Sequence, residues 1–357
     1  MKVRTRDLIS ALALPALAAF GTWAFLVNRW VIHWVDGSAK TLATAGLALG
    51  LGVVSGAPLC FGWRRLPNQL ALGVLLLFSA GELRRFVLRS EYRAEPAEPN
   101  GAASLLRPVT TTELEVRRFE APLPKLSIPR LRVLHVSDLH VGEDVPWSYF
   151  ERILAALHSE EPDLIVLTGD YISKRERLPL LERWLHGMAR PRYGSFAVLG
   201  NHDHWTGEPD RVTAVLGSAG VEVLRGACKT VALSPGARIR ICGTEAPWGP
   251  ALGRDLADAP HDLPSLVLSH TPDNVYDLAE LDAGAVFAGH THGGQIRLPV
   301  LGALIVPSRY GRRFDRGHFV VSGTHLFVSA GVGADAPPLR LWCPPELVVV
   351  DFVRRSY

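Results

Sequence analysis

The chain has 357 residues, of which 48% are hydrophobic and 20% are charged. This length exceeds that of one ordinary domain, and the hydrophobic share indicates apolar segments in addition to a soluble core. The formal net charge of +3 at pH 7 argues against the strongly basic surface of a nucleic-acid-binding protein, and four cysteines do not make a disulfide scaffold. The composition therefore favours a membrane part joined to a globular part.

The apolar residues are concentrated at the N-terminus. Residues 8–27 and 41–63 each form a run long enough to cross about 30 Å of hydrocarbon, whereas residues 70–80 are too few. We predict a membrane region over residues 1–90 with two or three hydrophobic helices, most simply two transmembrane helices and a third segment at the interface. The alternatives are a large buried helical core and a cleavable signal peptide, which the length of the first run and the presence of a second disfavour.

Basic residues predict the orientation of these helices. Lys2, Arg4 and Arg6 place the N-terminus in the cytoplasm by the positive-inside rule. Two crossings return the next arginines to that side, and the globular part with them, whereas a third crossing would reverse its position. These arginines are Arg64, Arg65, Arg84, Arg85, Arg89 and Arg93.

Residues 91–112 are expected to form a linker, because residues 94–101 are polar and rich in proline. Residues 113–357 then show strands that alternate with helices, which predicts an α/β domain. Residues 221–224, 231–233 and 239–241 are expected to form successive antiparallel strands. The other expected strands are 112–119, 131–136, 164–167, 195–199, 266–268, 285–288, 325–329 and 347–352, and the expected helices are 147–160, 180–188 and 211–219.

The cysteines lack the spacing of metal ligands. Cys60 lies in an apolar run, and Cys228, Cys242 and Cys343 are far apart in the sequence. We expect buried free thiols.

Polar side chains that can bind a metal follow five of the expected strands. In open α/β sheets ligands bind at the carboxyl ends of the strands, so these side chains should meet at one site. Imidazole nitrogens together with carboxylate and amide oxygens suit Mn, Fe, Zn or Co. The candidates are Asp138 and His140, Asp170, Asn201, His270, and His290 and His292.

These seven residues are enough for two divalent metal ions. We expect Asp138, His140 and His292 on one metal, Asn201, His270 and His290 on the other, and the Asp170 carboxylate on both. Two metals roughly 3.5–4 Å apart can hold a phosphate and activate a bridging water for attack in line with phosphorus. The pattern therefore predicts phosphoester hydrolysis by a metal-bridging hydroxide.

His202 lies outside this ligand set but in the same turn as Asn201. We expect it to bind a phosphate oxygen and to protonate or stabilise the leaving group, with Asp203 orienting its ring. Any one of these histidines alone would be interpreted as a core or surface residue, and that interpretation is kept for the remaining histidines, including His204.

Together these segments resemble the calcineurin-like metallophosphoesterase superfamily. The resemblance covers about residues 131–352 and includes Asp138-Leu-His140, Gly169-Asp170, Gly200-Asn-His-Asp203, His270 and Gly289-His-Thr-His-Gly-Gly294. It implies a four-layer αββα sandwich, a dinuclear metal centre, and hydrolysis of phosphomonoesters, phosphodiesters or pyrophosphates.

Two further segments resemble the membrane-associated bacterial branch, which includes small phosphodiesterases and enzymes that cleave UDP-2,3-diacylglucosamine. These segments are Gln295 after the glycines and residues 338–346. Together with the apolar runs, the resemblance predicts a multi-pass protein of the bacterial inner (cytoplasmic) membrane that acts on a phosphate-containing, lipid-linked substrate.

Three positions depart from related patterns. Ser173 stands where many relatives carry a second acidic residue. Residues 170–176 lack the Asp-Arg-Gly continuation of Ser/Thr protein phosphatases, and Asp203 replaces their glutamate. A protein phosphatase is therefore not expected.

A basic segment follows the last metal-binding loop. Residues 298–307 are apolar, and Arg309, Arg312, Arg313 and Arg316 come next. This stretch is interpreted either as a lip that enters lipid while Arg309, Arg312 and Arg313 bind substrate phosphates, or as a β-hairpin with a solvated basic turn.

The sequence thus leads to a membrane-anchored phosphohydrolase of a lipid-linked phosphodiester or pyrophosphate. The alternative within enzymes is a general phosphodiesterase of soluble nucleotides or small esters. A non-catalytic membrane scaffold is disfavoured because all seven ligands and His202 are present.

Overall fold

A computed structural model describes residues 93–94, 107–142, 145–252, 262–299 and 302–354. The chain forms two compact units, one of residues 1–91 with Pro307–Arg313 and one of Tyr92–Val306 with Phe314–Tyr357. The apolar runs predicted to cross the membrane lie outside the described residues. Among the helices that the structure does describe, none has the length and apolarity needed to span a bilayer. The predicted boundaries of the membrane region and linker stay predictions.

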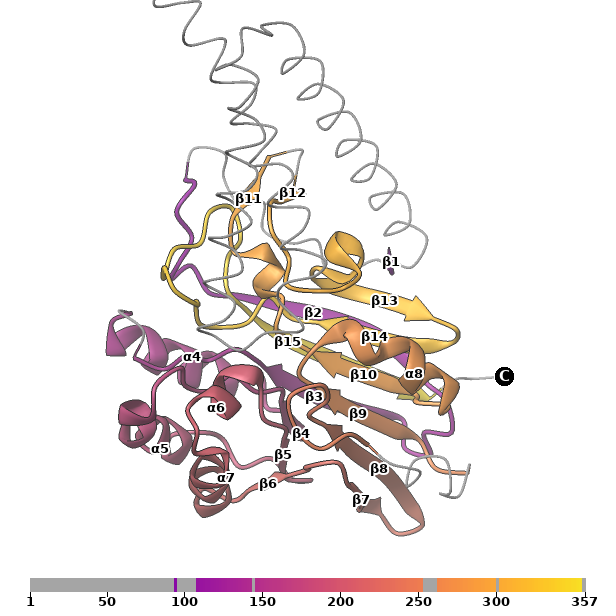
Figure 1. The fold of residues 1–357 in the computed structure, drawn as a ribbon. Helices are drawn as coiled ribbons and strands as arrows, with labels where there is room; N and C mark the ends of the chain where they lie inside the picture. Colours follow the sequence, from indigo (N-terminus) through magenta and orange to yellow (C-terminus); the bar gives the residue numbers. More distant parts are fainter. Residues whose placement is uncertain (1–92, 95–106, 143–144, 253–261, 300–301, 355–357) are drawn as a thin grey trace, which may run out of the picture. The chain divides into compact units, whose positions relative to one another are not determined.

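The second unit contains a six-stranded mixed sheet (Figure 1). Buried apolar runs supply its central strands, and neighbours β3, β4, β5 and β6 are parallel. The last strand, β15, runs parallel to β2 and antiparallel to β3. In spatial order the strands are β2 (Glu115–Leu123), β15 (Glu346–Arg354), β3 (Arg130–Val136), β4 (Leu164–Leu167), β5 (Ser195–Ala197) and β6 (Val221–Val223).

A seven-stranded mixed sheet lies beside the first. Its strands β8, β9, β10 and β14 are parallel, and β13 and β7 are antiparallel to their neighbours. In spatial order the strands are β1 (Arg93–Ala94), β13 (Gly317–Val321), β14 (Thr324–Val328), β10 (Ala285–Ala288), β9 (Ser265–Ser269), β8 (Ala237–Thr244) and β7 (Cys228–Ser234).

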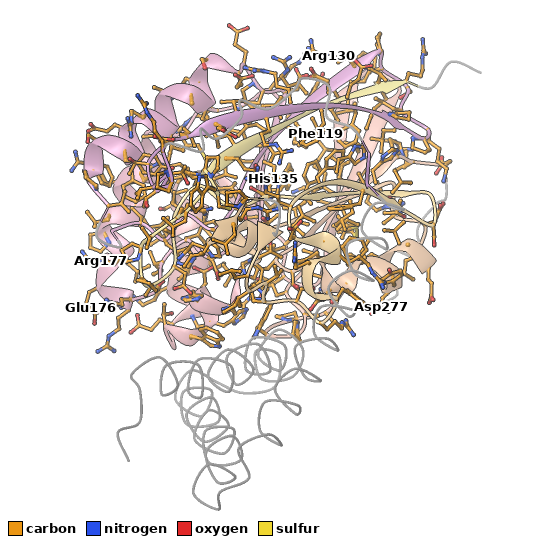
Figure 2. The ribbon with its side chains drawn as sticks, turned by 90° about the horizontal axis from the view of Figure 1, so that it is seen from above. Phe119, Arg130, His135, Glu176, Arg177 and Asp277 are labelled. Carbon is orange, nitrogen blue, oxygen red and sulfur yellow. A yellow bond between two sulfur atoms is a disulfide. The ribbon has the colours of Figure 1, made fainter. Side chains whose placement is uncertain are left out.

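Helices cover the outer faces of the two sheets, which gives the expected α/β sandwich (Figure 1). One apolar cluster joins the six-stranded sheet to its helices, and a second fills the space between the sheets. Figure 2 shows Phe119 and His135 in this interior and Glu176 and Asp277 at the periphery. The helices are α4 (Trp147–Ser159), α5 (Leu178–His186), α6 (Asn201–Trp205) and α7 (Pro209–Ser218) on the first sheet and α8 (Val275–Glu280) beside the second.

Short elements fill the connections. β11 (Arg297–Leu298) and β12 (Gly302–Ala303) form an antiparallel pair, so the apolar stretch after the last metal-binding loop contains the β-hairpin of the second interpretation. The 3-10 turns are η2 (Arg175–Arg177), η3 (Pro272–Asn274), η4 (His292–Gly294) and η5 (Gly311–Phe314).

Two expectations are wrong. The strand at Val221–Val223 does not join the later strands in an antiparallel series, because β6 completes the parallel edge of the six-stranded sheet while β7 and β8 belong to the other sheet. Cys228 and Cys242 are not free thiols, since they face each other across β7 and β8 and form a disulfide. Cys343 is free and buried, as expected.

Candidate metal centre

The candidate ligands leave the sheets at the carboxyl ends of five strands. Asp138 and His140 follow β3, Asp170 follows β4, and Asn201 begins α6 after β5. In the other sheet the equivalent loops follow β9 and β10, and they carry the remaining candidates, His270, His290 and His292. Both sheets thus present their loops to one region.

The backbone of these loops is strained in a way that ordinary loops rarely are. Asp138, His140, Asp170, His290 and His292 all have positive φ, from 41° to 67°. Non-glycine residues avoid this region, and such conformations cluster at functional sites where the surrounding fold holds them. Five of the seven candidates have this conformation, which indicates that the surrounding fold holds their side chains together at a functional site.

The first cluster comprises Asp138, His140, Asp170 and His292, all of which are buried. The Nε2 atoms of His140 and His292 lie 3.3 Å apart, and the His292 Nε2 lies 3.5 Å from Asp138 Oδ1. Asp170 Oδ2 lies 3.8 Å from His140 Nε2. These four side chains could hold one metal ion.

The second cluster comprises Asp170, His270 and His290, and Asn201 faces it. The His270 Nε2 lies 3.2 Å from Asp170 Oδ2 and 3.0 Å from Asn201 Oδ1. His270 Nδ1 donates to the carbonyl of Thr168 at 2.6 Å, so its Nε2 is the atom aimed into the cluster. Asp170 thus belongs to both clusters, as the sequence predicted for a bridging carboxylate.

The electrostatics of the site suit cation binding. Burial and the nearby His202 lower the pKa of His140 to about 4, so its imidazole is neutral at pH 7 and can act as a ligand. Burial alone would lower the pKa of His270, but the Asp170 carboxylate raises it to about 9. A cation can take the place of that proton between the two side chains.

Glycines let the loops approach the carboxylates. A Cβ built on Gly200 would lie 2.1 Å from Asp170 Oδ1, and one on Gly289 would lie 2.3 Å from Asp138 Oδ2. The backbone N–H of His290 donates to both oxygens of Asp138 at 3.0 and 3.1 Å. Only glycine permits this packing at positions 200 and 289.

The family model for calcineurin-like phosphoesterases matches residues 131–294. Phosphodiesterase YaeI of Escherichia coli (strain K12) is 31% identical over 227 residues, which cover 62% of this chain and 82% of that protein. The chain belongs to the calcineurin-like phosphoesterase family. It is therefore a metal-dependent phosphoric ester hydrolase with two divalent metal ions, and the Asp and His clusters fit that centre.

Two other relatives of this calcineurin-like phosphoesterase are named for a lipid-linked substrate and for a membrane location. The UDP-2,3-diacylglucosamine pyrophosphatase LpxG of Chlamydia trachomatis is 27% identical over 300 residues, which cover 66% of this chain and 88% of LpxG. A transmembrane protein with metallophosphoesterase domain from Danio rerio is 29% identical over 346 residues, which cover 84% of this chain and 78% of that protein.

His202 lies beside the metal clusters. Its backbone N–H donates to Asp170 Oδ1 at 2.8 Å, and its ring contacts the His140 ring at a centroid distance of 4.8 Å. Its side chain is 17% exposed, and its Nε2 lies 3.7 Å from Asp335 Oδ2. The carboxylate that faces His202 is therefore Asp335, which the sequence did not single out.

The structure corrects the role expected for Asp203. Its Oδ2 accepts from the N–H groups of Asp170 and Gly200 at 2.7 and 2.9 Å, and its Oδ1 accepts from the N–H of Tyr171 at 3.0 Å. These bonds direct both oxygens to the backbone rather than to the ring of His202. Asp203 thus joins the turn after β4 to the turn after β5, which positions two candidate ligands relative to each other.

Gln295 explains how Asp335 reaches the site. Its Oε1 accepts from the N–H of Asp335 at 2.9 Å, and its Nε2 donates to the carbonyls of Asp335 and Pro337 at 3.0 and 2.9 Å. The glutamine that resembled the bacterial branch therefore holds the loop that faces His202. Ser173 has a related part, since its Oγ lies 2.9 Å from His140 Nδ1.

Further residues around the centre were not predicted. The Trp248 ring lies 4.8 Å from the His290 ring and 5.6 Å from the His270 ring, between centroids. The fully buried Arg340 donates to the carbonyls of Ala330 and His292 at 2.6 and 3.3 Å. Trp248 has no local sequence signal, whereas Arg340 lies within residues 338–346, the segment that resembled the bacterial branch.

The predicted substrate-binding arginines belong to the other compact unit. Arg309, Arg312 and Arg313 belong to the segment Pro307–Arg313, which groups with residues 1–91 and not with the catalytic unit. Their binding of substrate stays a prediction. Arg316 belongs to the catalytic unit and lies 4.0 Å from the buried Glu346 carboxylate.

Proposed function

We propose that the protein is a membrane-anchored phosphohydrolase that cleaves a phosphodiester or pyrophosphate bond in a lipid-linked substrate. The observation that carries the hydrolytic part is the pair of ligand clusters that share Asp170, with His202 beside them. The family supplies the general reaction, and the substrate and the membrane anchor are our extension of it.

The proposed ligands are the seven side chains predicted from the sequence. When bound, two divalent metals polarise the phosphoryl oxygens and lower the pKa of the attacking water. The chain itself fixes the geometry, because Asp170 faces His140 on one side and His270 on the other. His202, which faces Asp335, is placed to hydrogen-bond a phosphate oxygen and to protonate the leaving group.

The apolar runs within residues 1–90 support the membrane anchor, and the name of the zebrafish relative agrees with it. The name of the LpxG relative supports a lipid-linked pyrophosphate. The name of YaeI supports the alternative, a general phosphodiesterase. A scaffold without activity is disfavoured because the described domain keeps every ligand and His202 in one place.

Two observations bear on which face of the membrane carries the active site. The basic residues of the N-terminal region favour the cytoplasmic face. The Cys228–Cys242 disulfide favours an oxidising compartment, because disulfides are rare in the cytosol. Alkylation of the denatured protein without reductant decides between them: four reactive thiols support the cytoplasmic face, and two support the outer face.

The experiment that tests the function compares two substrates with the full chain in detergent and Mn²⁺. A UDP-linked diacylglucosamine should release UMP much faster than bis-p-nitrophenyl phosphate releases p-nitrophenol. Turnover of the chromogenic ester alone would leave the general phosphodiesterase as the better description. If neither ester is hydrolysed by metal-loaded protein, the proposed function is wrong.

Two variants test the residue roles. Asp170→Asn should abolish turnover and weaken the binding of both metals, because this carboxylate faces both clusters. His202→Ala should lower kcat while the protein keeps its two metals, as measured by elemental analysis. Loss of the metals in His202→Ala would contradict the assignment of His202 to the leaving group.

A further inference from the structure

Trp205 lies one helical turn after His202 on α6, so the two side chains share a face of the helix. Their ring centroids are 4.9 Å apart, with an angle of 50° between the planes. Trp205 is 36% exposed, whereas its helix neighbour Asp203 is fully buried. Part of the indole surface is thus exposed to solvent directly beside the residue assigned to the leaving group.

The helix that carries this indole is held firmly. Asp203 fixes the first turn of α6 through backbone N–H groups. The His204 Nε2 lies 3.1 Å from a carboxylate oxygen of Glu245, which is fully buried and also accepts from the N–H of Leu199 at 3.1 Å. The position of Trp205 relative to His202 is therefore set by the fold before any substrate binds.

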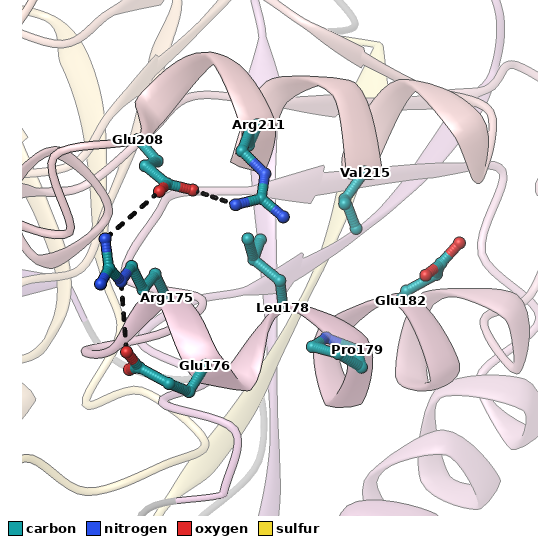
Figure 3. Close-up of a pocket in the computed structure, with 8 residues that line it drawn as sticks. All are labelled: Arg175, Glu176, Leu178, Pro179, Glu182, Glu208, Arg211 and Val215. Carbon is teal, nitrogen blue, oxygen red and sulfur yellow. Dashed lines mark hydrogen bonds and ion pairs between the residues drawn. The ribbon is translucent and has the colours of Figure 1, made fainter.

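The surface that follows Trp205 in the chain is charged. Glu208 lines a groove of about 490 Å³ between η2, α5 and α7 (Figure 3). Its carboxylate lies 3.7 Å from Arg175 and also pairs with Arg211. Arg175 also pairs with Glu176 at 3.2 Å, so two carboxylates offset the charges of the two arginines, and the groove itself is not an anion site.

The surroundings also decide what kind of group suits Trp205. Among the described residues, the exposed large hydrophobic side chains are Val109, Trp205 and Val320, and the two valines lie before β2 and on β13. A single exposed indole offers too little apolar surface for an acyl chain, whose burial scales with area. It does offer a flat face on which a planar ring with polar edges can stack.

We propose that Trp205 is a specificity-determining residue that stacks against the base of a nucleoside esterified to the scissile phosphate. The inference rests on the proposed hydrolytic function and narrows its substrates to nucleoside phosphodiesters and nucleoside diphosphate esters. The base lies on Trp205, and the phosphate lies between His202 and the metal clusters. A lipid, where present, occupies the other side of the scissile bond.

The test compares two chromogenic diesters that share the p-nitrophenolate leaving group. One is thymidine 5′-phosphate p-nitrophenyl ester, and the other is methyl p-nitrophenyl phosphate. The readout is the ratio of kcat/KM for the nucleoside ester to that for the methyl ester, in the full chain with Mn²⁺. We expect Trp205→Ala to lower this ratio roughly 5- to 100-fold, mainly through KM, because base stacking is of that size.

Matched variants separate stacking from bulk. Trp205→Phe keeps an aromatic face and should retain most of the ratio, whereas Trp205→Leu keeps apolar bulk without that face and should lose it. The inhibition constant of UMP should rise in Trp205→Ala relative to that of inorganic phosphate. Metal content and thermal unfolding of each variant confirm that the domain is folded.

Three results would overturn the inference. An unchanged ratio in Trp205→Ala means that the indole does not contact the nucleoside. Equal losses for both esters mean that Trp205 acts only by positioning His202. An unchanged ratio with weaker binding to anionic vesicles assigns the indole to a lipid surface. In contrast, failure of the wild type to hydrolyse either ester would count against the proposed function and not against Trp205.

Discussion

Asp203→Asn is the change that most directly tests how the site is built. The wild-type carboxylate is fully buried and accepts from three backbone N–H groups, those of Asp170, Gly200 and Tyr171, within 3.0 Å. Asparagine has nearly the same shape, but one of its two terminal atoms is a donor. Whichever way the amide turns, an NH₂ group faces at least one backbone N–H that previously had an acceptor.

The expected cost follows from these contacts. A buried donor left without an acceptor costs about 1–3 kcal/mol. With one or two N–H groups affected, the free energy of unfolding should fall by about 2–4 kcal/mol. For a domain of this size that loss lowers Tm by roughly 4–16 °C. Metal affinity should fall too, because Asp170 and Asn201 are no longer held in register.

The assay is thermal and urea unfolding with and without Mn²⁺, together with kcat on the same preparations. Asp335→Asn is the matched control, since its side chain is 42% exposed. It should leave stability within about 0.5 kcal/mol of wild type. Its kcat should fall roughly tenfold, because His202 loses the carboxylate that faces it.

The opposite pattern would refute this reasoning. If Asp203→Asn unfolds like the wild type and binds both metals but has lost kcat, the carboxylate acts on the chemistry, as the sequence suggested. A stability loss in Asp335→Asn as large as that in Asp203→Asn would show that the loop at Asp335 supports the fold rather than His202.

Three other measurements bear on the site and its support. Glu346→Gln should lower the free energy of unfolding at pH 7 by about 3–5 kcal/mol, because the buried Arg117 guanidinium loses the negative charge of the carboxylate 3.1 Å away. Burial alone would raise the pKa of Glu346, but Arg117, Arg316 and the backbone N–H of Ala330 together outweigh it, and the pKa lies below its ordinary value of 4.5. The difference between Glu346→Gln and wild type in the free energy of unfolding by urea should therefore have its full value above about pH 4.5 and should shrink as the pH falls through the lowered pKa. A constant difference down to about pH 3 would argue against the ion pair. Gly200→Ala should weaken metal binding at least tenfold by titration calorimetry, because its Cβ would displace Asp170, whereas Gly217→Ala, whose Cβ meets open space, should bind metal normally. Removal of metals with EDTA should lower Tm reversibly. Relative to protein in Mn²⁺ at a hundredfold or more above its Kd, the free energy of unfolding should fall by about 2–4 kcal/mol. Failure of Tm to recover when Mn²⁺ is added back would contradict this expectation.

Local patterns in the sequence were sufficient for the parallel strands and the candidate ligands. The run at Leu164–Leu167 is apolar and is followed at once by Gly169 and Asp170, so strand, turn and ligand are encoded within seven residues. The same holds for Ala285–Ala288 and His290. Because the carboxyl ends of parallel strands meet at one edge, chain order alone predicts that such ligands converge.

Contacts between distant segments could not be derived in this way. Asp203 is adjacent to His202 in sequence, yet its oxygens turn to backbone N–H groups about 30 residues away, and Asp335 takes the place facing the ring. Trp248 approaches His290 from a loop of another strand. Each of these relations depends on how two loops are positioned, and side-chain type does not specify that.

The pairing of the strands could not be derived from local sequence either. Val221–Val223 alternates valine with an exposed glutamate, a pattern that would fit either sheet, and only its register beside β5 assigns it to the parallel edge. Cys228 and Cys242 are 14 residues apart, and only the antiparallel register of β7 and β8 places them opposite each other. The sequence by itself thus determined which residues could bind metals and at which strand ends. The tertiary structure decided which side chains face one another, because that depends on the packing of segments that are remote in the chain.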